Sequence, residues 1–286
     1  MIRLPTNHSF PDRLLKLFSW FCGLLLLFFF IYLFLDIARQ GLSQITFNFL
    51  TTDPMNAGRA GGIAPMLVST LLLLTLCLLV SLPIGIASAI YLAEYTDETQ
   101  WFARIIQTNL NVLASVPSIV MGLFGYAFFV VALGLGFSIL AGALTLACMV
   151  LPLLIRNIED SLRNIPDEYR INATALGLSR YRTIFQILLP MAARGILLAV
   201  ILSIGRAMAE TAALLYTSGY VSRMPESILD SGRSLSVHIF DLSMNVPGGE
   251  QNAYASAFTL IVLLLMINIT TLSLSRKIQK GAFSEH

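Results

Sequence analysis

The sequence predicts an all-α membrane protein that crosses the bilayer six times. Three observations carry this prediction. Hydrophobic residues make up 56% of the 286-residue chain and charged residues only 12%, a balance far from that of soluble globular domains. Several stretches without charge are long enough for a spanning helix, which needs about 20 apolar residues. Lysine and arginine fall mainly into the segments on one side of those stretches.

The charge-free stretches give the expected spans in chain order. The first, 17–35, is too long for the apolar core of a signal peptide and no small-residue cleavage site follows it, so we expect a retained anchor. The second lies within 60–93. Residues 105–155 carry no charge and have room for two spans, with a turn at Leu133-Gly134-Leu135-Gly136. The fifth and sixth spans are expected at 195–216 and 256–275.

The distribution of lysine and arginine sets the expected orientation. Thirteen of the 18 fall in the segments on the N-terminal side of the membrane, and Arg206 lies inside a span. The opposite side holds four: Arg39, Arg59, Arg223 and Arg233. Because the cytoplasmic side carries the excess of positive residues, both termini are predicted to be cytoplasmic. This positive charge follows the topology and indicates no nucleic-acid partner.

The chain is predicted to hold one membrane domain with short flanks. Residues 1–60 comprise a cytoplasmic N-terminus, the first span and an extracytoplasmic loop. Residues 61–280 form the transmembrane domain, which includes a structured loop at 159–190. Residues 281–286 are a cytoplasmic tail. No linker, repeat or low-complexity tract indicates a second domain.

Catalytic and metal-binding motifs are missing from the sequence. There is no Gly-x-x-x-x-Gly-Lys-Ser/Thr phosphate loop, so hydrolysis of ATP by that route is not expected of this chain. The histidines, His8, His238 and His286, are scattered singly, which is typical of ordinary surface residues. The three cysteines lie inside expected spans without metal-like spacing and are interpreted as inert thiols. We expect no enzyme, no metal site and no cofactor bound by this chain.

The loop at 159–190 is expected to fold as two short helices around a glycine turn. Opposite charges four residues apart, Arg156 with Asp160 and Glu159 with Arg163, are typical of a solvated helix surface. Pro166 fits the first position of the next helix, and Gly177 fits its left-handed cap. 

After the glycine, Ser179 can cap a second helix that leads to Pro190. The product is a compact knob with small apolar residues on one side. Such a knob either transmits motion from a soluble partner or is a helical hairpin that only packs against the membrane.

This segment has a defined spacing: Gly177, nine further residues, Ile187, one residue of any type, Leu189 and Pro190. The spacing resembles that of the "EAA" loop of importer-type ABC permeases, whose short helix docks on the ATPase subunit. The resemblance implies that coupling to an ATPase runs through 166–190. It places the coupling contacts at Ala173, Gly177, Arg180, Ile187, Leu189 and Pro190. Where that family has Glu-Ala-Ala, this chain has Ile171-Asn172-Ala173, so any polar contact made by that glutamate is lost.

Four further runs, 116–125, 205–217, 237–240 and 250–255, resemble the PstA-type phosphate permeases, and the form Glu210-Thr211-Ala212 favours this group over its PstC sisters. The resemblance covers nearly the whole chain after Gly61. It implies the type I (MetI-like) ABC importer bundle in a bacterial cytoplasmic (inner) membrane. It also implies import of inorganic phosphate together with a PstC-like permease, two PstB-like ATPase subunits that hold ATP and magnesium, and a PstS-like binding protein. A phosphate-sensing kinase regulator is a further implied partner.

Arg206 and Glu210 are the charged residues expected at depth in the membrane. At ~1.5 Å per residue, Arg206 lies ~18 Å from Arg194, near the midplane, where a charge costs at least ~2.5 kcal/mol. Spaced four apart on one helix, the two should face the interior and neutralise each other. They form either a buried structural ion pair or part of the phosphate path, together with Thr211. A guanidinium suits phosphate oxygens through its planar fork.

Two other functions remain open from the sequence. The permease could carry another tetrahedral oxyanion, sulfate or molybdate, because a single arginine does not discriminate among them. A membrane scaffold that senses phosphate and reports to a kinase is the second alternative.

Overall fold

A computed structural model describes residues 10–96 and 100–283 of the chain. His8 and His286 lie outside the described residues, as do residues 284–286 of the predicted tail at 281–286. Five helices are long and apolar enough to cross a membrane, or six if one bent pair counts as a single span. The spans are α1 (Phe10–Gly41), α3 (Ala64–Ile90), the bent pair α4 (Trp101–Ser115) and α5 (Ser118–Gly125), α6 (Ile139–Arg163), α9 (Leu189–Ala209) and α12 (Glu250–Phe283).

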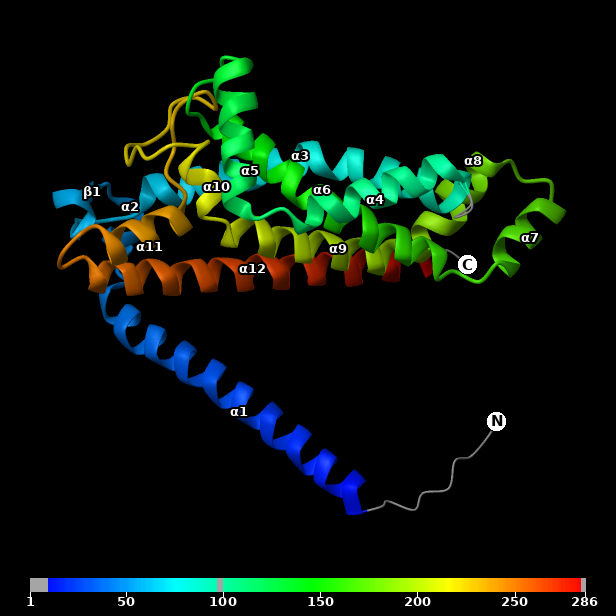
Figure 1. Ribbon diagram of the computed structural model, residues 1–286, viewed down its shortest axis with the longest axis horizontal. Helices are drawn as coiled ribbons and strands as arrows, with labels where there is room; N and C mark the ends of the chain where they lie inside the picture. The colour runs from blue at the N-terminus through cyan, green and yellow to red at the C-terminus, as the bar shows by residue number, and fades with distance from the viewer. Residues whose placement is uncertain (1–9, 97–99, 284–286) are drawn as a thin grey trace.

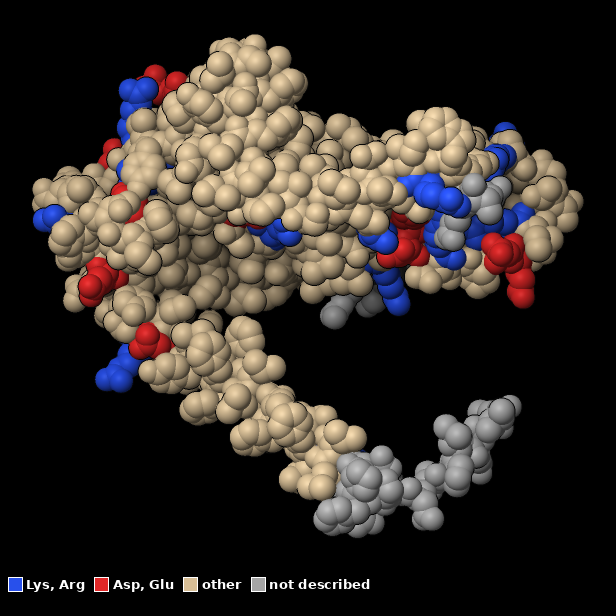
Figure 2. All heavy atoms as spheres, in the orientation of Figure 1, with Lys and Arg blue, Asp and Glu red and all other residues tan. Residues whose placement is uncertain are grey.

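The shorter elements gather at the two ends of the bundle (Figure 1). One end, here called the loop end, carries α7 (Glu168–Ala175) and α8 (Arg180–Arg182). The other, called the hairpin end, carries α2 (Phe47–Thr51), α11 (Leu235–Met244) and the antiparallel hairpin of β1 (Pro54–Met55) with β2 (Ala60–Gly61). Figure 2 shows charged atoms concentrated at both ends, with a largely uncharged band between them, as expected for helices that cross a bilayer.

The remaining elements connect these helices: the 3-10 turns η1 (Leu42–Gln44) and η2 (Asn56–Gly58), the π-helical turns η3 (Tyr91–Tyr95), η4 (Tyr126–Ala132) and η5 (Thr183–Leu188), and the short α10 (Ala212–Leu215). The turn predicted at 133–136 is confirmed. Gly134 and Gly136 both have left-handed backbone (φ 68° and 63°), which glycine adopts without strain.

The centre of the bundle is α6, whose side chains Leu146, Leu154 and Ile158 are fully buried. Small residues let the neighbouring helices approach it closely. A Cβ added at Gly85 of α3 would lie 2.7 Å from a terminal methyl of Leu154, so the leucine would have to move to admit it. Close backbone approach of this kind is a main source of helix association inside membranes.

The third span is broken rather than merely kinked. The axes of α4 and α5 differ by 103° across Val116 and Pro117. Proline disfavours helical backbone in the residue before it, and Val116 is accordingly extended (ψ 128°). The prolines of the second and fourth spans, Pro83 and Pro152, lie inside continuous helices.

The predicted fifth span, 195–216, is wrong at its C-terminal end. The helix α9 stops at Ala209, and Glu210 is extended (φ −72°, ψ 128°). The carbonyl of Glu210 accepts a hydrogen bond from Ser236 Oγ at 2.7 Å, so a side chain near the start of α11 takes the place of a helical partner. The chain then resumes helical backbone only for one turn, in α10.

The first helix stands apart from the others. Only its C-terminal part packs on α12, where the rings of Phe34 and Phe258 lie 6.4 Å apart, and the rest diverges from the bundle (Figure 1). None of its most apolar stretch is buried. Its side chains therefore need lipid or another protein as neighbours.

Candidate functional site

The loop between α6 and α9 forms the two short helices that the sequence predicts, although α7 begins at Glu168, two residues after Pro166. Gly177 has the predicted left-handed conformation (φ 73°). Leu178 N donates to Ala173 O at 3.0 Å and Gly177 N donates to Thr174 O at 2.9 Å, the hydrogen-bond pair of a Schellman cap. Ser179 Oγ accepts from Arg182 N at 3.4 Å, which confirms its capping role. The backbone continues through η5 into α9 without a break.

The exposed tip of this loop differs from the predicted knob. Ala173 is buried against the rest of the protein and cannot meet a partner directly. Large apolar side chains are exposed beside the small Ala175: Leu176 is 79% exposed, and Ile171 and Tyr181 are each 65% exposed. We call Ile171, Leu176 and Tyr181 the loop tip. Of the other residues expected to contact an ATPase, Gly177, Arg180 and Pro190 are exposed, whereas Ile187 and Leu189 are half-buried.

The loop is fastened to the end of the second span by an ion pair that the sequence did not predict. Arg170 Nη2 donates to Glu94 Oε1 at 2.6 Å, and its Nε lies 3.2 Å from both carboxylate oxygens. The same guanidinium donates to two backbone carbonyls at the end of α6. The hydrogen bond to Glu94 raises the pKa of Arg170, so its charge is fixed at any physiological pH. We call Arg170 with Glu94 the loop clamp.

Two more arginines join the same region of η3. Arg180 donates to the Glu94 carbonyl and its guanidinium lies 4.6 Å from the centre of the Tyr95 ring. Arg163 donates to Leu92 O at 2.9 Å. The last turn of α6, both loop helices and the end of α3 are therefore one connected unit, so a force on the loop tip reaches three spans.

Glu94→Ala is expected to loosen the loop while the bundle stays folded. Loss of the carboxylate removes charged hydrogen bonds worth about 2 kcal/mol in total. Tryptic cleavage after Arg180 and Arg182 in the detergent-purified protein should become clearly faster. Asp167→Asn is the matched control, because Asp167 pairs with the same Arg170 but its side chain is 87% exposed. Equal cleavage rates for Glu94→Ala and the unaltered protein would show that the clamp does not hold the loop.

Arg206 lies in the last turn of α9 and is exposed, where its charge also interacts favourably with the helix dipole. Arg206 lines a cavity of about 240 Å³ between α4, α6 and α9. Met149 and Pro152, from the middle of α6, line the same cavity. The predicted neutralisation by Glu210 is met only in part, because the charge of Arg206 still acts on the Glu210 carboxyl but the two side chains are not in contact. Among the described residues no ion pair joins the two, because the helix ends between them and Glu210 leaves its face. Thr211 is half-buried beside the break.

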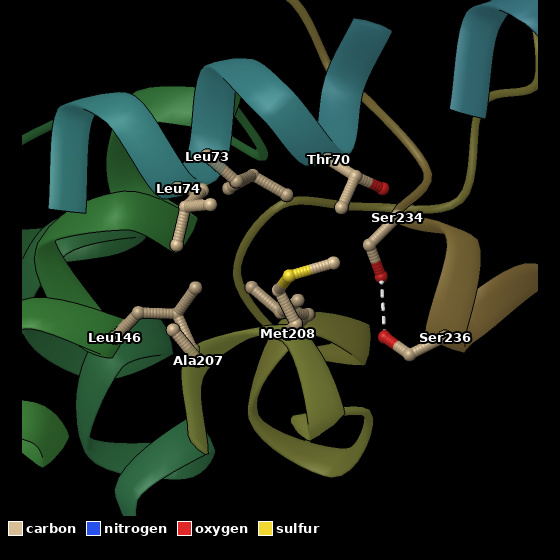
Figure 3. Close-up of a pocket in the computed structure, with 9 residues that line it drawn as sticks. Thr70, Leu73, Leu74, Leu146, Ala207, Met208, Ser234 and Ser236 are labelled. Atoms are coloured by element: carbon tan, nitrogen blue, oxygen red, sulfur yellow. Dashed lines mark hydrogen bonds between the residues drawn. The ribbon is translucent and has the colours of Figure 1, made fainter. Parts of the chain in front are cut away.

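The protein interior behind Arg206 is closely packed. Figure 3 shows side chains of α3, α6 and α9 and of the segment that begins α11 converging on one small space. Its volume is only about 10 Å³, enough for about one water molecule. Ser234 Oγ and Ser236 Oγ lie 2.9 Å apart at its edge. An ion could not pass through this part of the subunit. The arginine is therefore accessible from the outer face of the bundle, not from its core.

The two charge pairs predicted on α6 have different outcomes. Glu159 and Arg163 form an ion pair, with Arg163 Nε 2.9 Å from Glu159 Oε1. Glu159 is buried, so the interpretation of this pair as part of a solvated helix surface is wrong for that side chain. Arg156 and Asp160 form none among the described residues. Arg156 Nη1 donates instead to the side-chain oxygen of Asn111 on α4.

A second polar cluster holds the hairpin end together. Arg233 Nη1 donates to Asp241 at 2.9 Å, and its guanidinium lies 4.3 Å from the centre of the Tyr220 ring. Tyr220 and Asn245 both donate to Asp241. Burial raises the pKa of Asp241, but these donors and the charge of Arg233 outweigh it, so the pKa is lowered overall. The side chains lock the 216–234 segment onto α11.

His238 is buried in this cluster, which corrects its interpretation as a surface residue. A Cβ added at Gly58, which has φ 90°, would lie 3.0 Å from the imidazole carbon, so the ring packs directly under the hairpin turn. Burial, and then the charge of Arg233, lower its pKa from 6.5 to about 4. The folded protein therefore holds the neutral imidazole.

Acidification should destabilise the hairpin end through His238. The unfolded chain binds a proton near pH 6.5 and the folded chain only near pH 4, so this stability is complete above pH 6.5 and is lost as pH falls toward 4. At pH 5 the loss is about 2 kcal/mol. Thermal unfolding of the purified protein at pH 7.5 and pH 5 should show a smaller pH-dependent drop for His238→Gln. Equal drops for the two proteins would contradict this origin.

Among the described residues, no group of three His, Cys, Asp or Glu could hold a metal ion. The three cysteines, Cys22, Cys77 and Cys148, are free.

Comparisons with known proteins agree with the helical architecture. The family described as "Binding-protein-dependent transport system inner membrane component" matches residues 81–282. The chain is 31% identical to a probable ABC transporter permease protein, YqgI, of Bacillus subtilis, over 96% of this chain and 98% of the relative. It is 36% identical to the phosphate transport system permease protein PstA of Yersinia pestis, over 80% of this chain and 77% of the relative.

A solved bacterial ABC transporter involved in import of the acidic polysaccharide alginate has a similar fold. Its matching chain has a TM-score of 0.66 and 17% identity, with coverage of 93% of this chain and 97% of that one. At this identity the likeness bears on the fold alone. It confirms the predicted bundle of an ABC importer permease.

Proposed function

The chain belongs to the family of binding-protein-dependent transport system inner membrane components, and on this basis we propose that it is the PstA-type permease subunit of an ATP-driven importer of inorganic phosphate. It is a multi-pass membrane protein and a permease subunit rather than an enzyme. The proposed location is a bacterial inner membrane, with the loop end facing the cytoplasm.

The observation that carries the proposal is the exposed Arg206 beside a cavity in an otherwise apolar band. An unpaired arginine facing lipid would be costly, so its exposed side needs water or a protein partner. The interior behind it is packed, so a path along this outer face requires a second wall. A PstC-like permease would supply that wall, and the guanidinium would hold the phosphate oxygens with charge-assisted hydrogen bonds. Glu210 and Thr211, at the break that follows α9, would border the same path.

The loop between α6 and α9 supports the proposal that separate ATPase subunits drive transport. A large apolar surface on an exposed cytoplasmic loop marks an interaction site. The loop tip would seat in a groove of a PstB-like ATPase, one of two copies, which would hold ATP and magnesium. The clamp would carry the motion of that ATPase to α3, and the continuous backbone of α8, η5 and α9 would carry it to Arg206.

At the opposite end, a PstS-like binding protein would deliver phosphate to the hairpin side. Closure of the ATPase pair on ATP would open the path toward this side, and hydrolysis would return it to the cytoplasmic side. The chain itself would bind no nucleotide.

Proteoliposomes that contain this chain with the partner permease, ATPase and binding protein test the proposal. They should accumulate labelled phosphate in the lumen only when ATP is enclosed there, on the side of the ATPase, and the binding protein is present outside. An excess of unlabelled phosphate should compete, whereas equal sulfate or molybdate should not. Competition by sulfate would assign another oxyanion as substrate. An intact complex without any ATP-driven flux would favour a sensing scaffold.

A further inference from the structure

Polar side chains continue from Arg206 toward the loop end, and the positive charge among them decreases in that direction. The cavity that Arg206 lines is also lined by Asn111 of α4 and by Arg156 and Asp160 of α6. A second cavity of about 180 Å³ adjoins it and shares Arg156 and Asp160. Both volumes are far larger than the ~10–15 Å³ that one water molecule occupies, so a small hydrated anion fits in either.

Arg156 lies one helical turn, ~6 Å, beyond Pro152 of the Arg206 cavity on the way to the loop end. Its side chain is exposed to both cavities. Within the described chain, its guanidinium makes one hydrogen bond, to the neutral oxygen of Asn111. The carboxylate of Asp160, which is four residues away on the same helix, does not pair with it. The positive charge of Arg156 is therefore held in place but not neutralised.

We propose that Arg156, oriented by Asn111, is a second binding subsite for the transported tetrahedral oxyanion, placed after Arg206 on the cytoplasmic half of the path. This subsite rests on the function proposed above. A single strong cation would trap a phosphate ion, whereas two weaker sites in series let the ion enter and leave. The planar guanidinium leaves several N–H donors available for anion oxygens once Asn111 has taken one.

The charge balance beyond Arg156 favours release. In the second cavity, Arg163 is paired with Glu159, and Gln107 also donates to that carboxylate at 3.3 Å. Asp160 adds a negative charge at the same level. An anion that leaves Arg156 therefore meets no net positive charge in this cavity and is passed to the cytoplasm.

Uptake of labelled inorganic phosphate by proteoliposomes that hold the complete transporter tests the subsite. Arg156→Gln should lower the ATP-driven rate about tenfold, since it removes a charge-assisted contact with the ion. Arg156→Lys should retain an intermediate rate. Arg104→Gln, which alters an exposed arginine of α4 outside both cavities, should transport at the unaltered rate. Co-purification of the partner subunits checks that each variant assembles.

Asn111→Asp gives a second, independent test because it leaves Arg156 in place. The new carboxylate would pair with the guanidinium that already contacts position 111, so uptake should fall as far as in Arg156→Gln. If Arg156→Gln does not assemble, Asn111→Asp decides the matter. Near-normal uptake by the assembled variants, with Arg206→Gln inactive, would overturn the subsite and leave the proposed function standing. Normal uptake by Arg206→Gln as well would overturn the path itself.

Discussion

Arg206→Gln is expected to lower ATP-driven phosphate uptake by about 100-fold, which corresponds to the loss of about 3 kcal/mol of charged hydrogen bonding to the ion. Glutamine keeps the approximate length and polarity of the side chain but has no charge. The side chain is exposed and no described residue pairs with it, so the substitution leaves no buried charge without a partner. Assembly with the partner subunits should therefore persist, and uptake by the reconstituted complex is the measurement.

Two further variants sharpen this result. Arg206→Lys keeps the charge without the planar fork and should show intermediate uptake. Arg104→Gln removes an exposed arginine from α4, outside the cavity, and should behave as the unaltered protein. Wild-type uptake by Arg206→Gln in an assembled complex would remove this residue from the path.

Leu176→Asp is expected to abolish association with the ATPase subunit. Leu176 is the most exposed member of the loop tip, at 79%, and a carboxylate in its place would have to be desolvated in an apolar groove at a cost of several kcal/mol. Because this side chain makes little contact with its own subunit, the permease should still fold. Co-purification of the ATPase with the detergent-solubilised permease pair measures the effect.

The matched control is Leu42→Asp, which places the same charge on a leucine that is 60% exposed at the hairpin end. It should co-purify with the ATPase normally. Equal retention of the ATPase by both variants would mean that the loop tip is not the docking surface.

Much of the fold follows from properties that are local in the sequence. Charge-free runs located the spans, because each helix must satisfy its own backbone in lipid. Gly177 and Ser179 were correctly assigned as caps, since left-handed backbone and side-chain capping depend on one or two residues. The size of the break at Pro117 could not be predicted, because it depends on how α5 packs rather than on the proline alone.

The errors concern contacts between residues far apart in the chain. The helix α9 ends at Ala209, and the Glu210 carbonyl that follows is satisfied by Ser236, 26 residues later; no periodicity reveals such a partner. The loop clamp joins Arg170 to Glu94 across 76 residues. A signal for it existed, since Glu94 is an acidic residue at the end of an apolar run, but its partner could not be chosen from sequence. His238 was misassigned for the same reason: its burial depends on the hairpin that folds over it.

The central claim is that a separate ATPase drives this subunit through the loop between α6 and α9. Replacement of residues 168–182 by a flexible Gly-Ser linker of equal length, in the reconstituted complex, tests it most directly. ATP-driven accumulation of labelled phosphate should fall to the level seen without ATP, while the two permeases still co-purify. Accumulation at the unaltered rate would contradict the account.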